Sequence, residues 1–240
     1  MKYLVLFTAL LPVIFLLYFV NKKDSKLPEP KGELVRAVFY GVISVFLSLL
    51  ISTPLLFLGL YSEQPTTILG AISTAFLGAA IPEEVAKYVM LWLFLRNNKY
   101  FDERFDCILY AVCVSMGFAA LENIAYLFIN YNSWLSVGIA RAVYAVPGHF
   151  CFGVLMGYYY SLSRFPHTYV ESNRAMALFL PILAHGIYDA LLFMMRVDEI
   201  LAIILYIIFL VFCNNIWKFS SQKIEELLKR DTEEMPNTNT

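Results

Sequence analysis

The chain is poor in charge. Only 15% of its 240 residues are Asp, Glu, Lys or Arg, whereas 60% are hydrophobic, and the mean hydropathy is +0.65. Soluble domains carry about a quarter charged residues, so this composition argues against a soluble globular protein. No block of basic residues is present, and the formal net charge is -1. We therefore expect no nucleic-acid partner.

Several common motifs are also missing. None of the four cysteines is arranged as Cys-x-x-Cys, so we expect small buried side chains rather than a metal or redox site. No His-Glu-x-x-His motif is present, and no internal repeat is evident. The apolar run 3–20 continues into polar residues without a small-x-small cleavage pattern, which predicts a retained helix rather than a signal peptide.

Long apolar runs dominate what remains. Each is long enough to cross about 30 Å of hydrocarbon as a helix, which is the expected spanning form because it satisfies its own backbone groups. The sequence predicts an all-α, polytopic bundle of seven spans near 3–20, 34–60, 67–95, 105–129, 135–161, 174–195 and 199–217. We expect one transmembrane domain, 1–217, with its catalytic core near 68–195, and a partly disordered tail, 218–240.

The loops alternate in positive charge. Fourteen of the eighteen Lys and Arg residues fall on one side of the predicted membrane and two on the other, while Lys87 and Arg141 lie within spans. The positive side is normally cytoplasmic, so we predict an outside N-terminus and a cytoplasmic C-terminus. In the tail, residues 221–230 have an amphipathic pattern, and 233–240 have the composition of a disordered end.

Ionisable groups inside the spans are unusually numerous. Such groups are expensive in a bilayer and need a partner or a function. A single ionisable residue in a span could have a purely structural explanation, whereas eight of them in one small bundle favour a polar cavity. These residues are Glu83, Glu84, Lys87, Glu122, Arg141, His149, His185 and Asp189.

The third span holds two adjacent carboxylates. Lys87 lies four residues after Glu83 and three after Glu84, so its ammonium can reach either. Adjacent carboxylates resist ionising together, which suits one of them to general-base chemistry. The alternative is a buried ion pair that only fixes helix packing.

Two intramembrane histidines lie at a similar depth to this pair. Glu84, His149 and His185 each lie sixteen to nineteen residues from the middle of the nearest positive loop, so their depths differ by roughly a few ångströms. Asp189, four residues after His185, can orient that imidazole. By the same count, Glu122 and Arg141 form a second layer nearer the outer face, where they are expected to pair.

These residues fall in four motifs that resemble the PrsW family of bacterial intramembrane proteases, relatives of the CAAX-type prenyl-protease superfamily. The resemblance covers about residues 70 to 195 and rests on Glu83-Glu84-x-x-Lys87, Phe118-x-x-x-Glu122-Asn123-x-x-Tyr126, Pro147-Gly148-His149 with Gly153 and Gly157, and His185-Gly186-x-Tyr188-Asp189.

The resemblance implies an intramembrane endopeptidase in the bacterial plasma membrane. The implied substrate is a single-span membrane protein, and the family is known for site-one cleavage of an anti-sigma factor. The implied catalytic residues are Glu83, Glu84, His149 and His185, and the implied supporting residues are Lys87, Glu122, Asn123 and Asp189.

Two chemistries remain open. In one, a glutamate of the 83/84 pair and His149 activate water, and His185 stabilises the oxyanion or protonates the amine. In the other, His149, His185 and Glu84 bind zinc. We favour the first, with no cofactor. The rival functions are a transporter or proton relay, which also needs buried acids, and a membrane scaffold with structural ion pairs.

Overall fold

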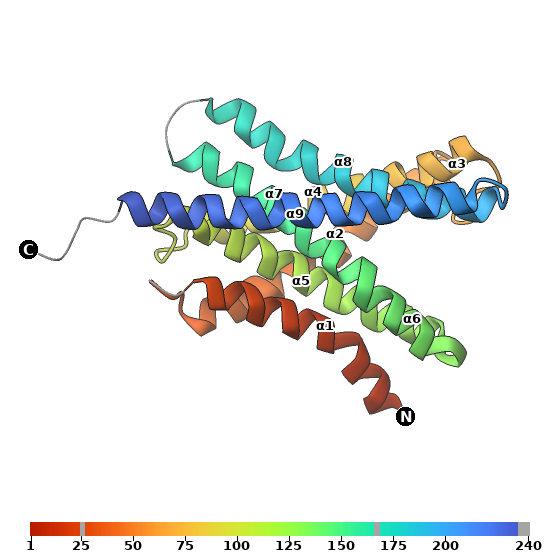
Figure 1. Cartoon of the computed structure of the whole chain (residues 1–240), viewed down its shortest axis with the longest axis horizontal. Helices are drawn as coiled ribbons and strands as arrows, with labels where there is room; N and C mark the ends of the chain where they lie inside the picture. The colour runs from red at the N-terminus through yellow and green to blue at the C-terminus, as the bar shows by residue number, and fades with distance from the viewer. Residues whose placement is uncertain (25–26, 166–168, 235–240) are drawn as a thin grey trace, which may run out of the picture.

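The computed structural model describes residues 1–24, 27–165 and 169–234, and within these ranges every regular element is a helix (Figure 1). Seven helical segments are long and apolar enough to cross a membrane, which confirms the predicted number of spans. The fold is therefore that of a multi-pass membrane protein. The fold does not fix which end of the bundle faces the cytoplasm, so the N-out orientation stays a prediction.

Five of the spans are single helices, and two are interrupted by π-helical segments. The single helices are α1 (Lys2–Lys23), α2 (Lys31–Phe57), α5 (Arg104–Ile129), α8 (Val170–Val197) and α9 (Ala202–Glu234). The third span consists of α3 (Ile68–Ser73), η1 (Thr74–Ala80) and α4 (Ile81–Leu95). The fifth consists of the short turn η2 (Tyr131–Ser133), α6 (Trp134–Ala140), η3 (Arg141–Ala145) and α7 (Val146–Arg164).

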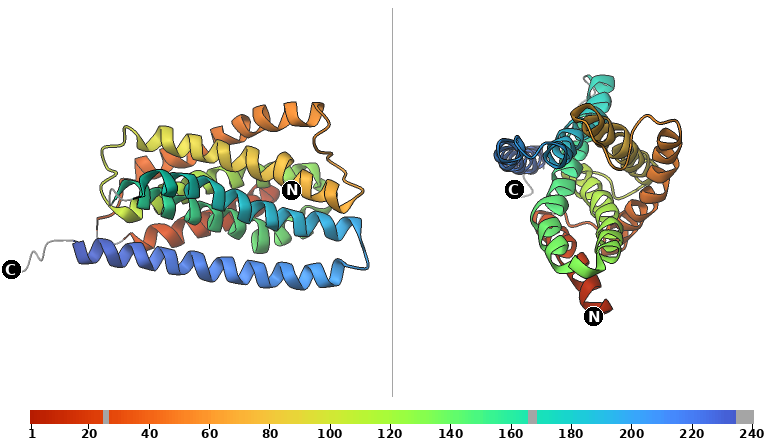
Figure 2. Two further views of the ribbon diagram at one scale, coloured as in Figure 1. Left: turned by 90° about the horizontal axis from the view of Figure 1, so that it is seen from above. Right: turned by 90° about the vertical axis from the view of Figure 1, so that its right-hand side faces the viewer.

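Helices α5 and α7 form the centre of the bundle. In the apolar 18-residue window of each span, 56% of the residues are buried in α5 and in the span that ends with α7, whereas 6% are buried in α9, which lies on the outside (Figure 2). A helix that is hydrophobic all round is suited to such a central position. Helix α5 begins with a capping box, in which Glu103 and Asp106 each accept a hydrogen bond from the other's backbone N–H.

Gly157 and Gly186 are among the glycines that allow helices to approach closely. A Cβ atom at Gly157 of α7 would lie 2.4 Å from the carbonyl oxygen of Cys107 in α5. A Cβ at Gly186 of α8 would lie 2.2 Å from the ring of Phe76 in η1. Small residues at these positions therefore set how close α7 and α8 come to their neighbours.

Helix α9 extends beyond the predicted end of its span at residue 217. It continues through the amphipathic stretch 221–230, and Asp231 accepts hydrogen bonds from the backbone N–H groups of Arg104 (3.1 Å) and Phe105 (2.8 Å) at the start of α5. Asp231 thus satisfies helix donors that have no intrahelical partner. The predicted disorder of 233–240 falls largely on residues 235–240, which lie outside the described ranges.

Candidate active site

Two π-helical segments precede the helices that carry Glu83, Glu84 and His149. In η1 the N–H of Ile81 bonds the carbonyl of Phe76, and in η3 the N–H of Val146 bonds that of Arg141, five residues back in each case. A proline follows each of these donors, at positions 82 and 147, and proline has no N–H to continue the regular ladder. Such π-helical turns are common at functional sites.

The ammonium of Lys87 is the centre of the cluster. Its Nζ donates to Glu84 Oε1 (2.8 Å) and Glu83 Oε2 (3.4 Å), and it lies 3.3 Å from His149 Nδ1. It also lies 4.2 Å from the ring centroid of Phe118. Lys87 and Glu84 are both buried, so the charge of each is stabilised by the other.

The imidazole of His185 faces carboxylates through both ring nitrogens. Its Nδ1 lies 2.8 Å from Glu84 Oε1, and its Nε2 lies 3.3 Å from Asp189 Oδ2 and 4.0 Å from Glu83 Oε2. The spacing of His185 and Asp189 predicted the second contact. Two acceptors on opposite sides of the ring suit a doubly protonated imidazole.

The tautomer of His149 follows from its neighbours. A lysine ammonium only donates hydrogen bonds, so Nδ1 of His149 must accept from Lys87. The proton of a neutral ring is then on Nε2, which lies 2.9 Å from Glu122 Oε2 and donates to it. Both nitrogens of His149 are therefore engaged.

Glu122 contacts residues of both layers that counting residues along the spans had placed at different depths. Arg141 Nη2 donates to Glu122 Oε2 (2.5 Å), which confirms the predicted ion pair. The same oxygen contacts His149, however, so the prediction of a separate outer layer was wrong. The count treated the fifth span as one regular helix, whereas η3 interrupts it. Asn123 accepts from Arg141 Nε (2.5 Å) and donates to the Ala9 carbonyl (3.1 Å), tying α5 to α1.

The structure therefore brings together all eight residues singled out in the sequence for catalysis or support. It adds two that the sequence analysis missed. Phe152 stacks on the ring of His185 with centroids 4.8 Å apart, and Ser115 donates to the backbone carbonyl of His149 (2.7 Å). The sequence did contain a sign of Phe152, because this residue lies three residues after His149 and therefore on the same helix face. Nothing in the sequence distinguished Ser115.

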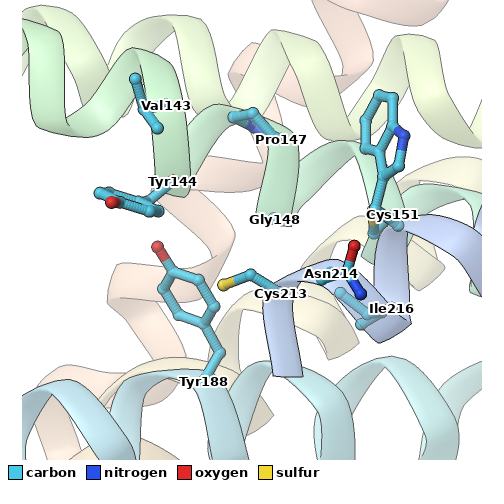
Figure 3. Close-up of a pocket in the computed structure, with 10 residues that line it drawn as sticks. Val143, Tyr144, Pro147, Gly148, Cys151, Tyr188, Cys213, Asn214 and Ile216 are labelled. Carbon is cyan, nitrogen blue, oxygen red and sulfur yellow. The ribbon is translucent and has the colours of Figure 1, made fainter. Parts of the chain in front are cut away.

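An apolar cavity lies beside this cluster, between α7, α8 and α9 (Figure 3). Its volume is 370 Å³, and its lining includes Gly148 and Tyr188, the sequence neighbours of His149 and Asp189. Tyr144 and Tyr188 flank one end of the cavity in the close-up, and Cys213 of α9 faces them. The polar cluster thus lies beside an apolar space between these three helices.

The donor set near Lys87 is chemically suited to a metal. One ligand atom from each of Glu83, Glu84 and His149 lies within 4.8 Å of the others, and Glu84 Oε2 is buried without a hydrogen-bond partner among the described residues. Carboxylate and imidazole groups are typical zinc ligands. The ammonium of Lys87 lies among these same atoms, so a cation bound there would have to displace it.

Comparison with known proteins identifies the family. Residues 29–214 match the family described as PrsW family intramembrane metalloprotease. The chain belongs to the PrsW family. Protease PrsW of Clostridioides difficile (strain 630) is 33% identical over 227 residues, covering 92% of this chain and 90% of that protein.

Other relatives agree. Protease PrsW of Geobacillus kaustophilus is 34% identical over 75% of this chain and 76% of that protein, and Protease PrsW of Bacillus subtilis is 33% identical over 75% and 79%. No solved structure matches the chain significantly. Membership of a protease family favours the protease interpretation over a transporter or a scaffold.

Proposed function

We propose that this chain is an intramembrane endopeptidase in which Glu83 is the general base. The observation that carries this proposal is the difference between the two adjacent glutamates. Glu84 is fully buried and contacts Lys87 and His185 at 2.8 Å, whereas the Glu83 side chain is 14% exposed, with longer contacts of 3.4 and 4.0 Å. Glu83 therefore has the freer oxygens and the better access for a water molecule.

The neighbouring groups have distinct roles in this mechanism. Glu83 removes a proton from water as it attacks the scissile carbonyl. His185, which Asp189 orients, stabilises the oxyanion and then protonates the leaving amine. Glu84 holds His185 and Lys87 in place. His149 is a positioning residue, since its two nitrogens contact Lys87 and Glu122.

Zinc is the alternative that the family description favours. Glu83, Glu84 and His149 would hold the ion after Lys87 moved away, and His185 would be a further donor only if it left Glu84 or Asp189. A bound zinc ion lowers the pKa of a coordinated water and polarises a carbonyl. The place of Lys87 among these donors leads us to favour the metal-free route.

The proposed substrate is a single-span membrane protein. The site lies within the spans and beside an apolar cavity, which suits a peptide bond within or next to the bilayer. By resemblance to the family, we propose an anti-sigma factor as this substrate.

Substitutions in the full chain, co-expressed with a single-span substrate, test the proposal. We predict that Glu83→Gln lowers cleavage about a hundredfold or more at every pH, because a lost general base cannot be replaced. Glu84→Gln and His185→Ala should also abolish cleavage, whereas His149→Ala should leave a low residual activity, with each protein still folded in the membrane. His149→Ala acts through Lys87, so its residual activity should have a changed pH profile. Asp189→Ala should cost less, about ten- to a hundredfold.

The matched control is Glu199→Gln, which removes an exposed carboxylate from the α8–α9 connection and should leave cleavage unchanged. If the reaction needs no metal, chelators should leave cleavage of the substrate unchanged. If zinc is required, chelators should abolish cleavage, and added zinc should restore it. Wild-type cleavage by Glu83→Gln would refute the assignment of the base. Wild-type cleavage by all four variants would mean that the cluster is only structural.

A further inference from the structure

Five carboxylic acids gather at the end of the bundle where α1 ends and α5 begins. They come from three stretches of chain: Asp24 after α1, Glu29 before α2, and Asp102, Glu103 and Asp106 around the start of α5. Asp106 lies sixteen residues before Glu122 on the same helix, or about 24 Å along its axis. The group is therefore separate from the catalytic cluster.

The carboxylates form two overlapping sets of three. One ligand oxygen from each of Asp24, Glu103 and Asp106 lies within 4.8 Å of the others, and the same is true of Glu29, Asp102 and Asp106. An ion with oxygen ligands at about 2.3–2.6 Å has ligands up to about 5 Å apart across it. Both sets therefore have the dimensions of part of a coordination shell, and Asp106 belongs to both.

Asp106 supplies an independent sign of an occupant. Its side chain is fully buried, and its Oδ2 accepts hydrogen bonds from the backbone N–H groups of Asp102 (3.1 Å) and Glu103 (2.8 Å). Its Oδ1 is buried and accepts no hydrogen bond from any donor among the residues that the structure describes. A buried, unpaired carboxylate oxygen is costly unless a cation compensates it.

We propose that Asp24, Glu29, Asp102, Glu103 and Asp106 bind one hard divalent cation, Mg²⁺ or Ca²⁺. The donors are all oxygen, which suits these ions and not zinc. Tyr110 donates a hydrogen bond to Glu29 and thereby orients one ligand. The ion fastens the connection between α1 and α2 to the start of α5, where Asp231 of α9 also binds.

Protons are the competing way to neutralise this group. Burial raises the pKa of Glu29 to about 7, a rise that the hydrogen bond from Tyr110 opposes and the carboxylates of Asp24 and Asp102 reinforce. Burial likewise raises the pKa of Glu103 to about 7, with Asp231, Asp24 and Asp102 adding to the effect. Since the folded pKa lies above the unfolded one, the folded state binds more protons, and stability falls as pH rises from about 5 to 8. Protons therefore compete least with a cation at pH 8.

The test is thermal unfolding of the purified full chain in detergent micelles at pH 8. After EDTA treatment and removal of the chelator, titration with MgCl₂ or CaCl₂ should raise the Tm of the wild type to a plateau. Asp102→Asn, at an exposed position, and Glu29→Gln, which still accepts from Tyr110, should weaken the apparent affinity about tenfold or more. Asp106→Asn should abolish the response. Glu171→Gln, an exposed carboxylate at the start of α8, should respond as the wild type does.

Two results would overturn the proposal. One is a wild-type Tm that rises when the pH is lowered but not when Mg²⁺ or Ca²⁺ is added, which would mean that protons alone neutralise the group. The other is an unchanged response in Asp102→Asn and Glu29→Gln, which would place the ion elsewhere. Glu83→Gln and His149→Ala should keep the response, which separates this site from any metal in the catalytic cluster.

Discussion

At the scale of single residues, the ion pair between Glu122 and Arg141 also involves Asn123 and His149. Arg141 contacts Glu122 and Asn123, and Glu122 also accepts from His149. Removing the guanidinium leaves a partly buried carboxylate with His149 as its remaining partner. We predict that Arg141→Ala lowers the free energy of unfolding by about 3–5 kcal/mol.

A double-mutant cycle in detergent micelles measures this coupling. The variant Arg141→Ala/Glu122→Ala should recover part of the loss, because the uncompensated carboxylate is gone. Arg174→Ala is the control, since its pair with Glu171 is exposed and should contribute little. Losses that simply add in the cycle would contradict a stabilising pair.

At the scale of helices, the close packing of α7 on α5 requires that residue 157 has no side chain, as glycine does. A Cβ at Gly157 would lie 2.4 Å from a backbone carbonyl of α5, which cannot move without shifting the helix. We predict that Gly157→Ala lowers the free energy of unfolding by about 1–3 kcal/mol, and that it lowers cleavage because α7 also carries His149.

Gly148→Ala is the matched control in the same helix. The nearest atom to a Cβ at this position is Tyr188 Cε2 at 3.5 Å, which is ordinary van der Waals contact. Its Tm in micelles should equal that of the wild type within about 1 °C, because the new methyl group fits without overpacking. Equal destabilisation by the two substitutions would show that close approach is not the cause.

At the scale of the whole molecule, the orientation in the membrane is the main prediction. The bundle has seven candidate spans, so the start of α1 and the end of α9 lie at opposite ends (Figure 1). The distribution of Lys and Arg predicts that the end with the α4–α5 connection is cytoplasmic. Reporter fusions at Thr66, Asn98 and the tail should therefore read outside, inside and inside, and a tail that reads outside would reverse the assignment.

The sequence by itself determined the class of fold, the number of spans and the eight polar residues that gather in the candidate site. Apolar runs of membrane-spanning length leave few alternatives to helices in lipid, because backbone groups must be satisfied locally. Charged residues within such runs are rare enough that their positions were informative. Hence Glu83, Glu84, His149 and His185 could be selected before any contact was known.

Only the tertiary structure decided how these residues share their partners. Residue counting assumes regular helices, so it could not foresee that the π-helical segment Arg141–Ala145 would accompany a contact between Glu122 and His149. It could not distinguish Glu83 from Glu84, because their difference lies in the contacts of Lys87 and His185. The group around Asp106 was likewise invisible, since its members come from separate connections and meet only when the helices pack.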